Sequence, residues 1–99
     1  MILVIKMTLK SFIWYILAGS RGGESRARIV KALKDRPYNA NQLAEILKMN
    51  YKTVRHHLKV LKDAGIIVIM ERKYGSVYTL SEEMEKIFEE FKEIWDKIG

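Results

Sequence analysis

Cysteine is absent from the 99 residues of this chain. Its absence excludes disulfide bonds, thiolate metal sites and a cysteine nucleophile. A chain without disulfides suits a reducing compartment, so we expect a cytoplasmic protein. Proline occurs once, at Pro37. Because the residue before a proline avoids the helical region, Pro37 predicts the end of a helix.

Long hydrophobic runs are missing as well. The longest uninterrupted apolar stretch, residues 12–18, is far shorter than the roughly 20 residues that cross a bilayer. Lys6 and Lys10 follow the apolar residues 1–5, whereas a signal peptide places its positive charge first. We therefore do not expect secretion or membrane insertion.

Positive charge is concentrated in the middle of the chain. Residues 21–80 contain 13 lysines and arginines against 5 acidic residues, a net +8, whereas residues 81–99 contain 3 lysines against 7 acidic residues, a net −4. A basic centre of this kind favours a polyanionic partner. An ordinary basic surface without such a partner is the alternative.

Residues 8–17 or 10–17 predict a first helix whose surface is apolar nearly all round. Its apolar side chains are Phe12, Ile13, Trp14, Tyr15, Ile16 and Leu17. A helix of this type must be buried, and a small chain has little core of its own to bury it. We therefore expect a partner subunit to cover this helix.

Three further helices are predicted from caps and periodicity. The second covers residues 24–35 and carries Arg26, Arg28, Lys31 and Lys34 on its outer side. Asn39 and Gln42 form a capping box at the start of the third helix. Asn50 caps the fourth, residues 51–64, and Gly65 fits a left-handed C-terminal cap.

After Gly65 the pattern changes from helix to strand. Residues 66–70 and 77–80 predict two strands joined through the turn-forming residues 71–76. Ser81 caps a last helix that is predicted to run to residue 98. Its apolar seam consists of Met84, Ile87, Phe91, Ile94 and Ile98.

This order of elements predicts a mainly α (α+β) fold, a winged helix-turn-helix of about five helices with a two-stranded β-hairpin as the wing. The whole chain forms one domain. Residues 1–20 and 81–99 are predicted dimerisation helices, and residues 21–80 are the predicted DNA-binding core.

Residues 53–67 closely resemble the recognition helix and strand entry of ArsR-type transcription regulators, and residues 41–47 resemble the helix before it. Residues 21–23 and 50–55 look like archaeal winged-helix regulators of that broad type. The resemblance implies a homodimer that binds double-stranded DNA, with residues 51–64 in the major groove and residues 71–76 along the backbone or minor groove.

The same resemblance implies roles for individual residues. The DNA contacts are expected at Tyr51, Lys52, Thr53, Arg55, His56, Arg72 and Lys73. Tyr51 and Thr53 could instead support the start of their helix. The dimer interface is expected at Phe12, Trp14, Ile16, Met84, Phe88, Phe91, Ile94 and Trp95. The aromatic residues among these could alternatively line an effector pocket.

Metal sensing and catalysis are not expected. The thiolates of metal-sensing relatives are replaced by Asn39-Ala40-Asn41, and the last helix has no histidine. His56 and His57 point about 100° apart on a helix, so they cannot chelate one ion together. No serine, histidine and aspartate spacing suggests a triad. We expect no cofactor and no enzyme activity.

Two alternatives to a DNA-binding regulator stay open. A winged-helix protein–protein module with an incidental basic face would bind a protein partner without DNA affinity. A membrane-anchored regulator would use residues 1–18 as its anchor. Steep salt dependence of duplex binding would favour the DNA-binding function.

Overall fold

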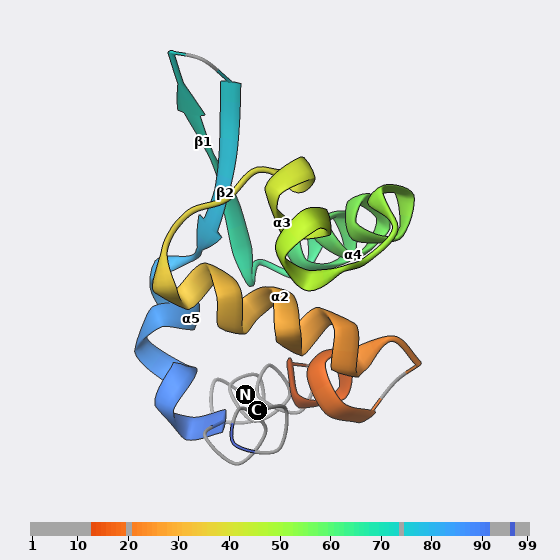
Figure 1. Ribbon diagram of the computed structural model, residues 1–99. Coiled ribbons are helices and arrows are strands. Elements are labelled where there is room, and N and C mark those ends of the chain that lie inside the picture. Colours follow the sequence, from red (N-terminus) through yellow and green to blue (C-terminus); the bar gives the residue numbers. More distant parts are fainter. Residues whose placement is uncertain (1–12, 20, 74, 92–95, 97–99) are drawn as a thin grey trace.

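The structure is a computed structural model that describes residues 13–19, 21–73, 75–91 and 96. It contains the winged helix-turn-helix architecture (Figure 1). The elements are η1 (Tyr15–Gly19), α2 (Gly23–Asp35), α3 (Ala40–Leu47), α4 (Tyr51–Asp63), β1 (Ile67–Arg72), β2 (Gly75–Leu80), α5 (Glu82–Ile87) and η2 (Phe88–Phe91). The predicted winged helix-turn-helix fold with a two-stranded hairpin is thus confirmed.

Helix α2 lies across the middle of the molecule. Helices α3 and α4 lie on one side of it, η1 lies on the other, and the hairpin projects away from the helices (Figure 1). Side chains from all these layers meet in one core. The largest fully buried ones are Leu17, Ile29, Val30, Leu33, Leu43, Val54, Leu58, Leu61, Ile66, Ile67 and Met84.

The predicted caps form the helix boundaries. Asn39 Oδ1 accepts a hydrogen bond from the Gln42 amide, and Gln42 Oε1 accepts one from the Asn39 amide, both at 2.8 Å. Asn50 Oδ1 accepts from the Lys52 and Thr53 amides at 2.8 and 3.3 Å. These bonds satisfy amides that a helix leaves unpaired at its N-terminus, so α3 and α4 begin where the sequence predicts.

The hairpin is antiparallel and longer than predicted. Its register pairs Ile67 with Leu80 and Arg72 with Gly75, so the strands extend into residues assigned to the turn. Tyr38 adds a third backbone segment, because its amide and carbonyl bond those of Tyr78 at 3.2 and 2.8 Å. The segment between α2 and α3 is thereby attached to the edge of the hairpin.

Three expectations about the helices were wrong. The last helix does not continue as one α-helix, because α5 ends at Ile87 and a 3-10 helix follows over Phe88–Phe91. The first helix changes to π-helical geometry at Tyr15 and continues to Gly19. Arg26 is buried, not on the outer side of α2, because its guanidinium finds acceptors inside the fold. The predicted helical residues 8–12 lie outside the described residues.

Candidate nucleic-acid interface

Helix α4 presents its first turn to solvent. Tyr51, Lys52 and Thr53 are all exposed. The first turn contains no acidic residue, so no carboxylate of the helix itself neutralises the positive end of the helix dipole. Anions, including phosphate groups, are therefore favoured at this end.

A row of cations continues along the exposed side of α4. Lys52, Arg55, Lys59 and Lys62 follow one another at intervals of three or four residues, which places them on one side of a helix. His56 is exposed beside them. Lys59 and Lys62 were missed in the sequence analysis, although the same spacing that selects Lys52 and Arg55 would have found them.

This cation row borders a cleft of about 500 Å³ between α4 and the hairpin. Arg55, His56, Lys59 and Lys62 line it from the helix, and Ile69 and Tyr78 line it from the strands. Asp63 also lines the cleft and pairs with Lys59 at 2.9 Å, which lowers the pKa of the Asp63 carboxyl. The wall formed by α4 is thus cationic.

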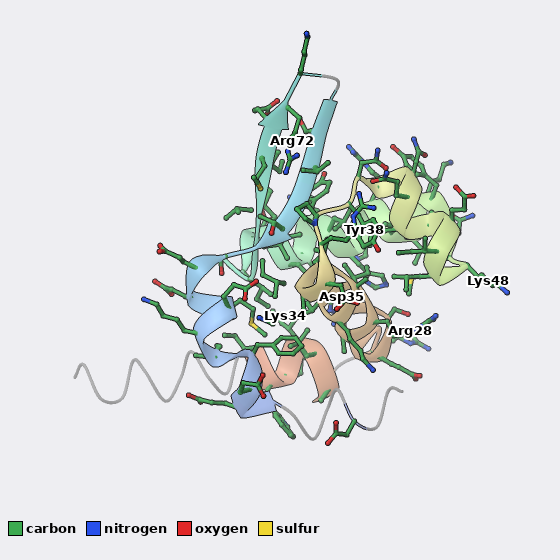
Figure 2. All side chains as sticks on the ribbon, turned by 60° about the vertical axis from the view of Figure 1, so that its left-hand side comes forward. Arg28, Lys34, Asp35, Tyr38, Lys48 and Arg72 are labelled. Atoms are coloured by element: carbon green, nitrogen blue, oxygen red, sulfur yellow. The ribbon has the colours of Figure 1, made fainter. Side chains whose placement is uncertain are left out.

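The predicted wing residues lie in a different cleft. Arg72 and Lys73 are exposed near the tip of the hairpin, and both line a second cleft of about 380 Å³. Figure 2 shows Arg72 on the hairpin and Tyr38 at its base. The structure therefore brings Arg55 and His56 together and places Arg72 and Lys73 apart from them.

The opposite side of α4 is held by a buried polar cluster. His57, 7% exposed, faces Arg26 of α2, 6% exposed, with 3.4 Å between His57 Nδ1 and Arg26 Nη1. Arg26 Nε donates to the carbonyl of Ile16 at 2.9 Å, and its Nη2 donates to the carbonyl of Arg21 at 3.2 Å. One guanidinium thus links η1, the following loop and α4. His57 therefore packs against α2.

The protonation state of His57 follows from this environment. Burial lowers the pKa of His57, and the nearby Arg26 guanidinium and His56 lower it further. A neutral imidazole can accept a hydrogen bond from Arg26 at Nδ1, whereas an imidazolium cannot. The neutral form therefore fits this site.

Because Gly22 has no side chain, His57 and Arg26 can pack closely against it. It precedes α2 with a φ of +84°, a conformation that favours glycine. A Cβ atom at this position would lie 2.9 Å from Cε1 of His57 and 3.1 Å from Nη1 of Arg26. The loop at residues 21–23 thus packs against the buried side of α4.

The predicted dimer residues occupy different environments. Trp14 is 46% exposed, and Phe88 is half-buried beneath Lys34 Nζ, 5.5 Å from its ring centre. Ile16 and Met84 are buried within the chain's own core. Phe12, Ile94 and Trp95 lie outside the described residues, as does the side chain of Phe91.

The described part of the chain holds no group of three or more histidine and acidic side chains arranged to bind a metal ion. None of its helices combines the length and the hydropathy required of a membrane-spanning segment.

Residues 23–68 match the sequence profile of the family described as "Bacterial regulatory protein, arsR family". This segment contains α2, α3, α4 and the beginning of β1. The match is to bacterial proteins, so the archaeal part of the expected resemblance is not supported. None of the curated protein sequences matches the chain significantly.

Solved structures of similar fold include three bacterial proteins. A homodimeric winged helix-turn-helix DNA-binding domain from Mycobacterium bovis, described as a possible ArsR-family transcriptional regulator, has a TM-score of 0.74 at 19% identity, over 95% of this chain and 84% of that one. The transcriptional regulator HlyU from Vibrio vulnificus has a TM-score of 0.68 at 19% identity, over 91% and 92% of the two chains. The transcriptional regulator YodB from B. subtilis has a TM-score of 0.68 at 23% identity, over 83% and 81%. The chain therefore has the winged helix-turn-helix fold, and its residues 23–68 are similar to regulators of the arsR family.

Proposed function

We propose that this chain is a transcription regulator that binds double-stranded DNA with sequence specificity and acts as a homodimer. The observation that carries the proposal is the cation row on the exposed side of α4, which begins at a capped helix N-terminus without an acidic residue. A helix of this kind fits the major groove, where side chains reach base edges.

In this function the exposed residues of α4 divide into base readers and backbone contacts. Arg55 lies one turn into α4 and is suited to guanine, because its planar guanidinium can donate two parallel hydrogen bonds. Tyr51, Lys52, Thr53 and His56 surround the same end of the helix. Arg72 and Lys73 on the hairpin contact phosphates or the minor groove, where they give affinity but little sequence information.

Dimer formation uses the two ends of the chain. The neighbouring residues Trp14 and Tyr15 leave 46% and 57% of their surfaces exposed. Exposed apolar surface of this kind is typical of an interface. The similar domain from Mycobacterium bovis is homodimeric, which supports the same assembly here. Trp14→Glu should convert a dimer to a species of the 11.6 kDa chain mass in sedimentation at micromolar concentration; an unchanged dimer would contradict this interface.

The proposed function includes no catalytic step, metal ion or cofactor. The cations on α4 and the hairpin supply the interaction with DNA, and a small-molecule effector is not part of the proposal. The protein acts in the cytoplasm, where its DNA partner is accessible.

Duplex binding across a salt series tests the proposal. A dimer that neutralises about eight phosphates should lose affinity with a log–log slope near −7. Lys52→Gln should flatten this slope, because one cation is removed from each recognition helix. The control is Lys86→Gln, which removes an equal charge from the exposed surface of α5. Salt-independent binding, or an equal loss in both variants, would contradict the proposed function.

A further inference from the structure

The hairpin is bordered by two clefts, not one. Neighbouring residues of β2 line different clefts, Tyr78 the one beside α4 and Val77 the second one. Successive side chains of a strand point to opposite faces, so the clefts lie on opposite sides of β2. Of the residues at the second cleft, only Arg72 and Lys73 were predicted from the sequence to contact DNA.

Six polar residues line the second cleft. Arg36 and Asn39 come from the segment between α2 and α3, Gln42 comes from the first turn of α3, and Arg72, Lys73 and Ser76 come from the hairpin. No acidic side chain is among the residues that line it. Three of the six carry a positive charge, so the cleft favours an anion.

Arg36 is held in place by stacking. Its guanidinium lies 4.6 Å from the centre of the Tyr38 ring, and its Nε donates to the carbonyl of Pro37 at 3.2 Å. Tyr38 is itself bonded to the Tyr78 backbone of β2 at 3.2 and 2.8 Å. The two terminal amino groups of Arg36 make no hydrogen bond that the described residues supply. A cation that is already ordered loses less side-chain entropy when it binds a ligand.

The capping box of α3 adds hydrogen-bond donors. Asn39 Oδ1 and Gln42 Oε1 both accept backbone hydrogen bonds, so the two amide oxygens are occupied. The NH₂ group of each side chain then remains as a donor on residues that line the cleft. The Ser76 hydroxyl, by contrast, donates to Glu71 Oε2 at 2.9 Å. The cleft therefore combines cations with amide donors, and the Asn39 and Gln42 amide oxygens are bonded to backbone amides.

We propose that the second cleft binds a phosphodiester group of the DNA backbone, with Arg36 and Arg72 as its principal cations. This inference rests on the proposed function and extends it to the segment between α2 and α3. The phosphodiester is favoured because a cleft on each side of the hairpin lets the wing contact the duplex backbone through both faces. Arginine also donates two parallel hydrogen bonds to phosphate oxygens.

The test uses the full-length chain and a duplex selected from a random pool. Arg36→Gln removes one phosphate contact from each subunit, so the log–log salt slope of a dimer should become about 1.8 less steep. Arg36→Lys retains the charge and should restore most of the slope. Lys86→Gln removes an equal charge from α5 and should leave the slope unchanged. The ratio of affinities for selected and scrambled duplexes should stay the same in all three variants.

The outcomes separate this inference from the proposed function. A steep wild-type slope that Arg36→Gln does not alter would overturn the second phosphate site and leave the proposed function intact. A wild type without salt-dependent duplex binding would overturn the proposed function itself. If Arg36→Gln shifts the urea unfolding midpoint, Arg36→Met, which keeps an unbranched apolar stem beside Tyr38, provides the same measurement, and an unaltered slope there overturns the inference.

Discussion

His56 and His57 are neighbours on α4, yet one ring is exposed and the other is buried against Arg26 of α2. The difference extends along the whole helix. Val54, Leu58 and Leu61 are buried on the side of His57, whereas the cation row lies on the side of His56. Histidine thus helps to hold the helix in place on one side and is exposed to solvent on the other.

Arg26 and Arg55 differ in the same way, because one is buried and the other is exposed. The guanidinium of Arg26 donates to two backbone carbonyls and lies close to His57, so its hydrogen bonds stabilise the fold. Arg55 is exposed and lines the cleft beside the hairpin. An arginine in a basic sequence can therefore be assigned to DNA binding only when its burial is known. The contrast predicts that the two sides of α4 respond differently to substitution.

Arg26→Ala should produce the largest loss of stability. It removes charge-assisted hydrogen bonds and leaves the buried carbonyl of Ile16 without this donor, which costs about 3 kcal/mol. Arg55→Ala, on the exposed side, should change the free energy of unfolding by less than about 0.5 kcal/mol. Urea denaturation of both variants measures the difference. Equal losses would show that the two sides of α4 are not distinct in this way.

Gly22→Ala should have an intermediate effect. The φ of +84° disfavours alanine, and the added Cβ would lie 2.9 Å from the His57 ring, so we expect a loss of about 1–2 kcal/mol. His57→Ala in the same chain removes the closer of the two contacts but not the backbone strain. The double variant should therefore lose less than the sum of the two single losses. Additive losses would indicate that Gly22 and His57 do not interact.

The smallest expected effect is a pH dependence of the folding stability that His57 contributes on the buried side of α4. Because burial and the charge of Arg26 lower the pKa of His57, the folded state binds this proton less readily than the unfolded chain does. The contribution of neutral His57 to stability is complete above the ordinary pKa of 6.5. It is lost as the pH falls through the lower folded-state value.

Stability measured by urea denaturation from about pH 8 to pH 5 should therefore decline below the ordinary histidine value, and His57→Gln should remove that part of the decline. His56→Gln, which changes the exposed ring, serves as the matched control. A decline that persists in His57→Gln but disappears in His56→Gln would contradict the assignment of the buried proton site.

The local parts of the fold were predictable from the sequence. Each helix cap joins residues only two or three positions apart, so a short segment of sequence is enough to predict it. The capping residues are Asn39 with Gln42, Asn50 and Ser81. Gly65 likewise adopts the predicted left-handed conformation, with a φ of +77°. The row from Lys52 to Lys62 follows from helical spacing alone.

The remaining features depend on contacts between distant segments. Arg26 is buried because Ile16 and His57, 10 and 31 positions away, surround it. Arg36 joins the second cleft because Tyr38 pairs with Tyr78. Met84 and Ile16, predicted at the dimer interface, lie in the core because α5 and η1 fold back on the chain. Periodicity identifies an apolar side of a helix but does not say which surface covers it.

Selection of bound duplexes from a random pool tests the central claim most directly. A two-fold dimer presents two α4 helices to successive major grooves, so the selected sequences should contain inverted half-sites with centres about 10 base pairs apart. Repeating the selection with Arg55→Ala should relax the preference at one position in each half-site, equivalent to about 1–3 kcal/mol of discrimination. A pool that shows no enriched sequence, or an enriched sequence that Arg55→Ala leaves unchanged, would contradict DNA reading by the exposed side of α4.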